Sequence, residues 1–170
     1  MKTILYMAMT LNGYVAKEND DTPWSDESWQ AYCDFVKRTK NIIIGGNTYR
    51  LLLSDPDFRG KIGNPLVVVV STSQKERGSA KDIIAKSPGD ALGAVEKAGF
   101  AQALVEGGGG VNASFLKEGL LDEIYVDIDP VIWGKGKKLF SDMEIDVDLE
   151  LLEVLAISNK LARLHYKVKK

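Results

Sequence analysis

Four consecutive glycines, Gly107, Gly108, Gly109 and Gly110, are the most distinctive chemical feature of the sequence. They follow an apolar run of strand length and precede a helical pattern that begins near Val111. Glycine lets a ligand approach the backbone closely, and the N–H groups at a helix start carry partial positive charge. The junction therefore predicts a pyrophosphate site, although the same residues also suit a simple tight turn. It does not fit the G-x-G-x-x-G or Walker patterns.

A second strand-to-helix junction of the same character lies at Gly45 and Gly46, followed by Asn47 and Thr48. Its backbone N–H groups would face the same kind of anion. Thr48 can donate its hydroxyl to a phosphate, but Asn47 or Thr48 serves equally well as the cap of a helix. Two such junctions favour an extended anionic ligand.

Hydroxyl side chains supply a third candidate site, because Ser71 and Thr72 directly follow the apolar run 66–70. The carboxyl ends of parallel strands are where α/β sheets bind ligands. Lys75 and Arg77 lie just beyond and are suited to a ribose 2′-phosphate. A hydroxyl-rich loop without a ligand is the alternative.

The single cysteine and the single histidine have no catalytic partner in view. Cys33 falls on the apolar face of a helical pattern and His165 on the polar face of a strand pattern, which predicts structural roles for both. One cysteine cannot close an intramolecular disulfide, and these two residues cannot make a structural zinc site. The sequence therefore favours a reducing cytoplasm and no metal.

Alternating strands and helices must position these junctions. Apolar runs of strand length occur at residues 4–9, 41–44, 66–70, 101–105 and 124–128. Helices are expected after the natural N-cap Ser25, from Asn47 or Thr48, from about 90 to 98, and from about 111 to 118. This order favours a mostly parallel sheet with helices on both faces. Residues 149–157 and 161–168 predict a C-terminal antiparallel hairpin.

The composition fits one domain over residues 1–170. Of the 170 residues, 45% are hydrophobic and 27% are charged, which is enough for a substantial core. Lys plus Arg total 22 and Asp plus Glu total 24, so the chain lacks the basic excess of a duplex-DNA binder. The apolar run 3–11 is too short to span a bilayer and predicts a buried strand, with a signal peptide as the alternative.

Several segments, taken in order, resemble the dihydrofolate reductase superfamily. They are residues 7–16 (Met-Ala-Met-Thr-Leu-Asn-Gly-Tyr-Val-Ala), the Pro23-Trp24 pair, residues 42–49 and residues 106–109. Residues 120–136 run from Leu-Leu-Asp-Glu through Pro130 to Gly-Lys-Gly. They are similar to the branch that contains the pyrimidine reductase domain of the riboflavin-biosynthesis deaminase-reductases. Each motif is short, but their shared order covers nearly the whole chain.

The resemblance implies an NADPH-dependent reductase with a three-layer α/β fold, and its branch suggests a homodimer. Hydride would pass to a small heterocyclic or phosphoribosylamino-pyrimidine substrate. Glu106 would face that substrate and position it or relay a proton. The resemblance also implies which residues contact the cofactor. Ala8 and Val15 would lie at the nicotinamide, and Ser71 and Thr72 on the adenosine side. The residues implied at the phosphates are Gly46, Asn47 and Thr48, those implied at the pyrophosphate are Gly108, Gly109, Gly110, Val111 and Asn112, and Gly45 and Gly107 complete the two junctions.

One position departs from the dihydrofolate reductases, which carry a buried carboxylate early in the helix after Pro-Trp. Trp29 occupies the best-matching place, so the sequence predicts weak or absent folate reduction. Asp26 and Glu27 suit the positive end of the helix dipole. The open alternatives are a dihydrofolate reductase that recruits Asp26 or Glu27 as its acid, a non-catalytic nucleotide-binding module, and a structural protein that binds no nucleotide.

The sequence also bears on Trp133 and Arg59. Trp133 either shields the cofactor or packs a dimer. Arg59 is expected to be an ordinary surface arginine.

Overall fold

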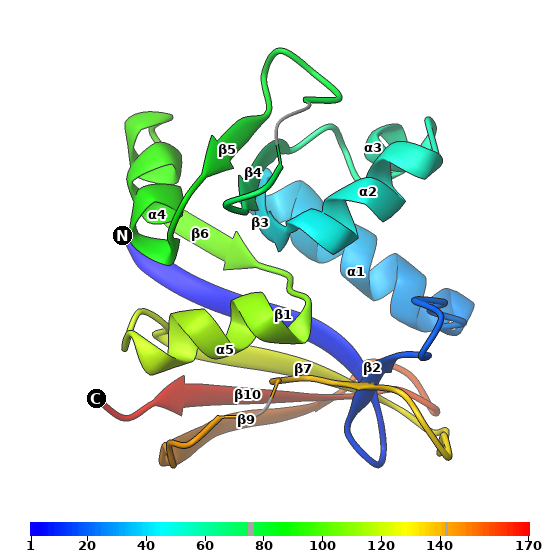
Figure 1. The fold of residues 1–170 in the computed structure, drawn as a ribbon. Coiled ribbons are helices and arrows are strands. Elements are labelled where there is room, and N and C mark those ends of the chain that lie inside the picture. Colours follow the sequence, from blue (N-terminus) through cyan, green and yellow to red (C-terminus); the bar gives the residue numbers. More distant parts are fainter. Residues whose placement is uncertain (75–76, 142) are drawn as a thin grey trace.

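Within residues 1–74, 77–141 and 143–170, which the computed structural model describes, the chain forms an eight-stranded sheet with helices on both faces (Figure 1). In spatial order the strands are β5 (Ile83–Ala85), β4 (Leu66–Val70), β3 (Asn41–Gly45), β6 (Gln102–Val105), β1 (Lys2–Thr10), β7 (Glu123–Asp129), β10 (Ala162–Val168) and β9 (Leu149–Ala156). Neighbours from β5 to β7 are parallel. Strand β10 is antiparallel to both β7 and β9, which confirms the mostly parallel sheet and the C-terminal hairpin.

The two faces of the sheet carry separate apolar clusters. Helices α1 (Asp26–Thr39) and α2 (Gly46–Ser54) and the short α3 (Phe58–Lys61) lie with the cluster that contains Ile42 and Ile44. Helices α4 (Pro88–Lys97) and α5 (Gly109–Lys117) lie with the cluster that contains Ile43. Strand β3 reads as a continuous apolar run because both of its faces are buried.

The start of α1 agrees with the sequence prediction. The Ser25 side chain accepts a hydrogen bond from the Ser28 amide at 3.2 Å, and Asp26 and Glu27 occupy the first turn. Cys33 is buried on the sheet-facing side of this helix. At the other end of the chain, His165 stacks on Tyr125 with ring centroids 3.8 Å apart.

Three other helices begin earlier than predicted. Helix α2 takes Gly45 as its N-cap and α5 takes Gly108, so Asn47, Thr48 and Val111 all lie inside their helices. The prediction that Asn47 or Thr48 caps α2 is therefore wrong, because each helix begins directly where its strand ends. Helix α4 begins at Pro88 with Ser87 as its cap. Proline is suited to the first position of a helix, because the N–H that it lacks would have no partner within the helix there.

Two segments far apart in the sequence are joined by a small sheet that was not predicted. Strand β2 (Tyr14–Ala16) pairs with β8 (Lys137–Lys138). Nearby, Trp133 is buried and stacks on Trp24 with ring centroids 5.0 Å apart. Trp133 thus packs within its own chain. Among the described residues, no helix is both long and apolar enough to cross a membrane.

Candidate functional site

The two glycine junctions touch each other at the carboxyl edge of the sheet. The amide of Gly45, at the β3–α2 junction, donates to the carbonyl of Gly107 at 2.7 Å. A Cβ atom on Gly45 would lie 3.0 Å from Val111 Cγ2, which leaves little room for any side chain. The structure therefore brings the starts of α2 and α5 together.

The hydroxyl residues predicted on neighbouring segments meet the same junctions. A Cβ atom on Gly46 would lie 3.2 Å from Ser71 Oγ, which places the end of β4 beside the start of α2. A Cβ atom on Gly108 would have Thr48 Oγ1 as its nearest neighbour, at 4.0 Å. Gly46, Thr48, Ser71 and Gly108 thus surround one region, whereas Asn47 and Thr72 are exposed.

The four glycines of residues 107–110 differ in what surrounds them. Gly107 has a φ of +86°, a conformation that favours glycine, and its peptide bond to Gly108 is cis. A Cβ atom on Gly109 would lie 2.7 Å from the Lys138 carbonyl oxygen, so Gly109 is needed for packing inside the protein. Gly108 keeps ordinary angles and open space at its Cβ position, and Gly110 is exposed. Gly108 is therefore the glycine best placed for ligand approach.

Asn112 supports the turn from inside α5. Its side-chain amide donates to the Leu139 carbonyl at 2.7 Å, and its backbone amide donates to the Gly108 carbonyl at 3.1 Å. The side-chain oxygen is buried and has no hydrogen-bond partner within the described part of the chain. Asn112 therefore holds the 107–110 turn and leaves one acceptor unused.

Glu106 is a buried carboxyl group directly after β6. Only 7% of the residue is exposed, and its Oε2 accepts a hydrogen bond from the Tyr32 hydroxyl at 3.0 Å. Its Oε1 is buried and finds no partner among the residues that the structure describes. Burial raises the pKa of Glu106 to about 8, against the lowering effect of the Tyr32 hydrogen bond. At neutral pH Glu106 therefore holds a proton.

Tyr32 belongs to a group of three aromatic rings next to Glu106. Ring centroids lie 5.5 Å apart for Trp29 and Tyr32, 5.4 Å for Trp29 and Phe58, and 6.4 Å for Tyr32 and Phe58. All three rings are half-buried, and we call them the aromatic surface. Burial and the neighbouring Glu106 raise the pKa of Tyr32, which therefore remains a hydrogen-bond donor. Tyr32 has no recognisable functional signal in the sequence, because its partner is 74 positions away.

The residues predicted at the nicotinamide lie on β1 and β2. Ala8 is two positions beyond Tyr6 on β1, so its side chain points to the same face of the sheet as Tyr6 and α1. Val15 is buried on β2. The first-turn acids lie elsewhere, since Asp26 is exposed and Glu27 faces Lys160 at 3.9 Å.

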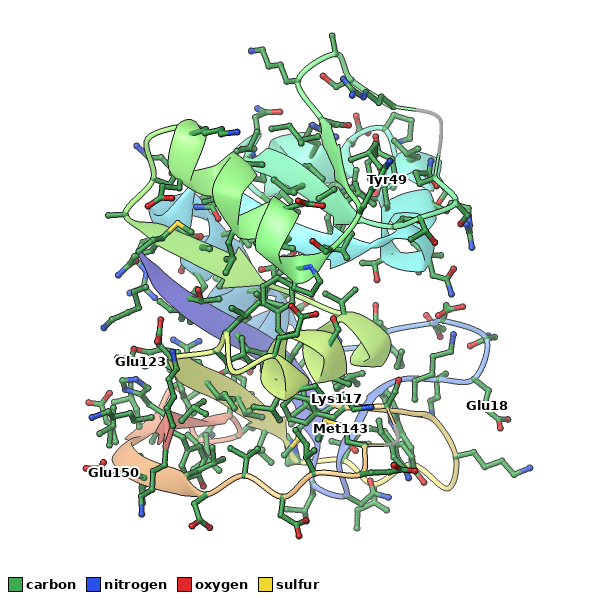
Figure 2. All side chains as sticks on the ribbon, turned by 60° about the vertical axis from the view of Figure 1, so that its left-hand side comes forward. Glu18, Tyr49, Lys117, Glu123, Met143 and Glu150 are labelled. Atoms are coloured by element: carbon green, nitrogen blue, oxygen red, sulfur yellow. The ribbon has the colours of Figure 1, made fainter. Side chains whose placement is uncertain are left out.

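A buried network orders the connection between β4 and β5. Asp82 accepts two hydrogen bonds from Arg59, at 2.7 and 2.9 Å, and one from the Tyr49 hydroxyl at 2.6 Å. The same hydroxyl accepts from the Gly78 amide at 2.6 Å, next to the exposed Arg77. Figure 2 shows Tyr49 among the side chains of this region. Arg59 is thus part of a buried ion pair, which corrects its expected surface role. Lys75 lies outside the described residues.

Two other buried carboxylates on the α1 face have their oxygens paired. Asp127 binds Arg163 through two hydrogen bonds, at 2.6 and 2.7 Å, and also accepts from the Tyr6 hydroxyl. Asp129 accepts from the hydroxyls of Ser25 and Ser28 and so ties the start of α1 to β7. These side chains are fully used in holding the fold together, which sets Glu106 apart.

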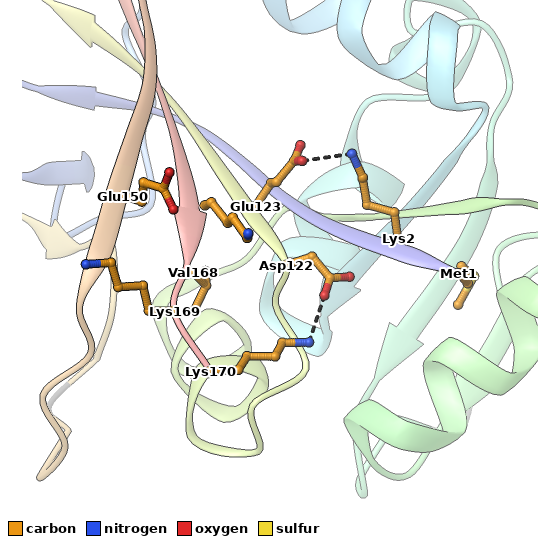
Figure 3. Close-up of a pocket in the computed structure, with 9 residues that line it drawn as sticks. Met1, Lys2, Asp122, Glu123, Glu150, Val168, Lys169 and Lys170 are labelled. Carbon is orange, nitrogen blue, oxygen red and sulfur yellow. Dashed lines mark hydrogen bonds and ion pairs between the residues drawn. The ribbon is translucent and has the colours of Figure 1, made fainter.

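A hollow near the chain ends is lined mainly by charged residues (Figure 3). Lys2 pairs with Glu123 at 2.8 Å and Lys170 with Asp122 at 2.7 Å. The hollow lies at the amino ends of β1 and β7, whereas the glycine junctions lie at the carboxyl edge. It is therefore separate from the candidate site.

Known proteins resemble this chain in sequence and in fold. The family model of the RibD C-terminal domain matches residues 1–162. The chain is 25% identical over 155 residues to the uncharacterized protein YwjB of Bacillus subtilis strain 168, covering 88% of each. A putative riboflavin biosynthesis protein from Shewanella sp. PV-4 superposes with a TM-score of 0.81 at 24% identity, over the full length of both chains.

A second solved structure is similar to this chain over part of its own length. It is a diaminohydroxyphosphoribosylaminopyrimidine deaminase/5-amino-6-(5-phosphoribosylamino)uracil reductase from Thermotoga maritima. The TM-score is 0.74 at 20% identity, and the match covers 99% of this chain and 56% of that one. These two structural likenesses show the fold.

Proposed function

The chain belongs to the family of RibD C-terminal domains, and from this membership and the site just described we propose that it is an NADPH-dependent reductase of a small heterocyclic substrate. We take residues 1–170 as one reductase domain. The observation that carries the proposal is the buried Glu106 Oε1, which has no hydrogen-bond partner among the described residues and lies beside the edge where the glycine junctions meet.

The residues at the two junctions fit an anionic dinucleotide. Helices α2 and α5 each span nine residues, and within the described residues neither has a side-chain hydrogen bond at its N-cap. Their first N–H groups are therefore available to phosphate oxygens, and the open side of Gly108 permits close approach. Gly46, Thr48 and Gly108 would hold the phosphates, Ser71 the adenosine side, and Ala8 the nicotinamide.

Reduction of a C=N bond needs a hydride at carbon and a proton at nitrogen. NADPH supplies the hydride when it is bound. Glu106 holds the proton at its carboxyl group, and the Tyr32 hydroxyl fixes Oε2 so that Oε1 remains for the substrate. When the proton passes to the substrate nitrogen, the resulting carboxylate keeps the hydrogen bond from Tyr32, which favours the charged form. Glu106 and Tyr32 thus position the substrate and deliver the proton.

An assay of NADPH oxidation tests the proposal. We expect oxidation with ribosylaminopyrimidines and little or none with dihydrofolate, because Trp29 stands where a folate reductase carries its acid. A missing proton donor costs roughly 10²- to 10⁴-fold in rate. Dihydrofolate turnover that survives Glu106→Gln but is lost in Asp26→Asn would instead identify a dihydrofolate reductase. Tight NADPH binding without oxidation by any pyrimidine or pterin would indicate a non-catalytic nucleotide-binding module.

We also propose that two copies of the chain associate through β9, in the cytoplasm. Every residue of β9 is exposed, although the strand is mostly apolar. Its large apolar side chains are Leu149, Leu151, Leu152, Val154 and Leu155. A long apolar edge strand left in water is a site for pairing with another chain, and a second copy supplies an equally apolar surface.

A further inference from the structure

The connection between β4 and β5 lies against helix α2 at both of its described ends, residues 71–74 and 77–82. At its start, a Cβ atom on Gly46 would lie 3.2 Å from Ser71 Oγ. Further along, a Cβ atom on Gly78 would overlap Leu53 Cδ2, so no side chain fits there without displacing Leu53. The connection therefore contacts α2 both at its first residue and in its last turn.

Tyr49, a buried residue of α2, holds the backbone of this connection. Its hydroxyl accepts a hydrogen bond from the Gly78 amide at 2.6 Å and donates one to Asp82 Oδ2 at 2.6 Å. The same carboxylate oxygen accepts from the Ser79 amide at 3.1 Å. One hydroxyl and the carboxylate that it contacts therefore bind two consecutive backbone N–H groups, those of residues 78 and 79.

Asp82 gives the Tyr49 hydroxyl a fixed partner. Only 1% of Asp82 is exposed, and its carboxylate accepts two hydrogen bonds from the Arg59 guanidinium, at 2.7 and 2.9 Å. A buried carboxylate bound in this way keeps one orientation, because moving away from its cation would leave a buried charge uncompensated. Burial and the hydrogen bond to Asp82 raise the pKa of Tyr49, so the hydroxyl keeps the proton that it donates. Removing the hydroxyl would therefore release the Gly78 amide without breaking the ion pair.

Arg77 directly precedes the two amides that Tyr49 and Asp82 bind. It is exposed, and its side chain has no hydrogen-bond or ion-pair partner among the described residues. A guanidinium binds phosphate through parallel N–H···O bonds, whose geometry depends on the direction from which the side chain approaches. The backbone at residue 77 sets that direction, and Tyr49 holds the backbone at the next residue.

On the premise of the proposed NADPH-dependent reductase, we infer that Tyr49 is a positioning residue for the cofactor, which directs Arg77 toward the 2′-phosphate by holding the Gly78 amide. Tyr49 is buried, so it acts on the cofactor through Arg77 and not by contact. NADH differs from NADPH only in lacking the 2′-phosphate. Tyr49 therefore contributes to the preference for NADPH over NADH and leaves the affinity for NADH unchanged.

A double-mutant cycle tests the inference. Calorimetry at one salt concentration measures the Kd of NADPH and of NADH for the unmodified protein, Tyr49→Phe, Arg77→Ala and the double variant. Tyr49→Phe should lower the ratio of the NADH Kd to the NADPH Kd by roughly two- to tenfold, the effect of one lost hydrogen bond, with the NADH Kd unchanged. Arg77→Ala should lower this ratio further. The double variant should match Arg77→Ala, because Tyr49 acts through that residue.

Three results of the cycle would overturn the inference. The Kd ratio is unchanged in a folded Tyr49→Phe protein, both Kd values rise by the same factor, or the two single effects multiply in the double variant. The outcomes also separate the inference from the proposed function. If the cycle gives the expected result but no pyrimidine or pterin oxidises NADPH, the reductase proposal fails and this inference stands. If NADPH is oxidised but the two effects multiply, the reductase proposal stands and this inference fails. Binding of neither dinucleotide would overturn both.

Two further variants complete the experiment. The matched control is Tyr125→Phe, which removes another tyrosine hydroxyl that donates to a carboxylate, on β7, and should leave both Kd values unchanged. Leu53→Ala removes the side chain on which Gly78 rests, from an exposed position, and should lower the Kd ratio in the same direction as Tyr49→Phe. If Tyr49→Phe fails to fold, Leu53→Ala takes its place in the cycle, and an unchanged ratio there would overturn the inference.

Discussion

Partners distinguish Glu106 from the other buried acids. Asp82 and Asp127 each bind an arginine through two hydrogen bonds, and Asp129 accepts from two serine hydroxyls. Glu106 receives one hydrogen bond from Tyr32 and faces no cation in the described structure. A buried charge without a partner is costly, so the group keeps its proton. Glu106 directly precedes Gly107, where the proposed reaction would use that proton.

Glu106→Gln should lower turnover by roughly 10²- to 10⁴-fold, because glutamine keeps the shape and the hydrogen bond but cannot transfer a proton. NADPH affinity should change little. Steady-state kinetics combined with a cofactor titration measure both effects. The control Glu27→Gln changes a partly exposed acid of α1 and should leave turnover unaffected. Equal turnover in the two variants would remove Glu106 from the reaction.

The turnover of the unmodified protein should fall as the pH rises through about 8, since the carboxylate has no proton to donate. The free energy of unfolding should also fall as the pH rises.

The pKa of Glu106 is raised from 4.5 to about 8 in the folded protein. The protonated Glu106 therefore stabilises the folded protein fully below pH 4.5, and this stabilisation is lost as the pH rises toward 8. Urea unfolding at several pH values, compared with Glu106→Gln, measures this. The two curves should differ in slope between pH 5 and 8.

At the scale of elements, the site depends on helices that begin where strands end. Helix α2 begins at Gly46, directly after the last residue of β3, and α5 begins at Gly109, soon after β6. Gly45 and Gly107 link the two junctions by a hydrogen bond of 2.7 Å. The proposed phosphate site therefore depends on the neighbouring strands β3 and β6 together rather than on either loop alone.

Neighbouring glycines should respond differently to substitution. Gly108→Val should weaken NADPH binding, because the valine side chain would block the approach of a ligand to the backbone. Folding should change little, because the Cβ position of Gly108 is open and its φ is ordinary. Gly109→Ala should destabilise the protein, because its Cβ would lie 2.7 Å from the Lys138 carbonyl oxygen. Thermal unfolding and cofactor titration of both variants measure the difference. A Gly108→Val protein that binds NADPH normally would show that the glycine run serves only the turn.

The connection between β4 and β5 should make the protein prefer NADPH to NADH. Arg77 follows Ser71 and Thr72 there and is suited to a 2′-phosphate. Loss of one charge-assisted contact costs roughly 1.5 to 3 kcal/mol, so Arg77→Ala should reduce the preference by about tenfold or more. Calorimetry at one salt concentration measures it, with the exposed Lys81→Ala as control. Equal affinities of the unmodified protein for both dinucleotides would contradict this placement.

At the scale of the whole molecule, the two edges of the sheet differ. Strand β5 has three residues, a length that gives another chain little to pair with. Strand β9 has eight residues, all exposed and mostly apolar. The β9 edge therefore offers a surface for a second copy, at the opposite side of the sheet from β3 and β4.

Leu151→Asp should convert the proposed dimer to a monomer, raising its dissociation constant by about 30-fold or more, as expected when a central apolar contact is lost. Cofactor binding should remain, because β9 is far along the sheet from the glycine junctions. Sedimentation velocity measures the change, and Glu153→Gln on the same strand is the control. If the unmodified protein sediments as a monomer at micromolar concentration, the β9 interface is wrong.

Local signals in the sequence determined most of the fold. Apolar runs predicted the main strands, and Ser25 with its following acids predicted the start of α1. The motif order predicted a family that the match over residues 1–162 confirms. The short elements β2, β5, β8 and α3 were missed, because a few residues cannot display a period.

Tertiary structure alone decided which side chains work together. Tyr32 and Glu106 are 74 positions apart, and Arg59 and Asp82 are 23 apart, so neither pair has a sequence pattern. The same applies to Trp133, which meets Trp24 only after folding. Helix and strand periods arise from neighbours along the chain, whereas burial and its effect on a pKa arise from neighbours in space. The sequence could therefore predict that Glu106 lies between a strand and the glycine run. The protonated state of its carboxyl group follows only from the residues that the fold places around it.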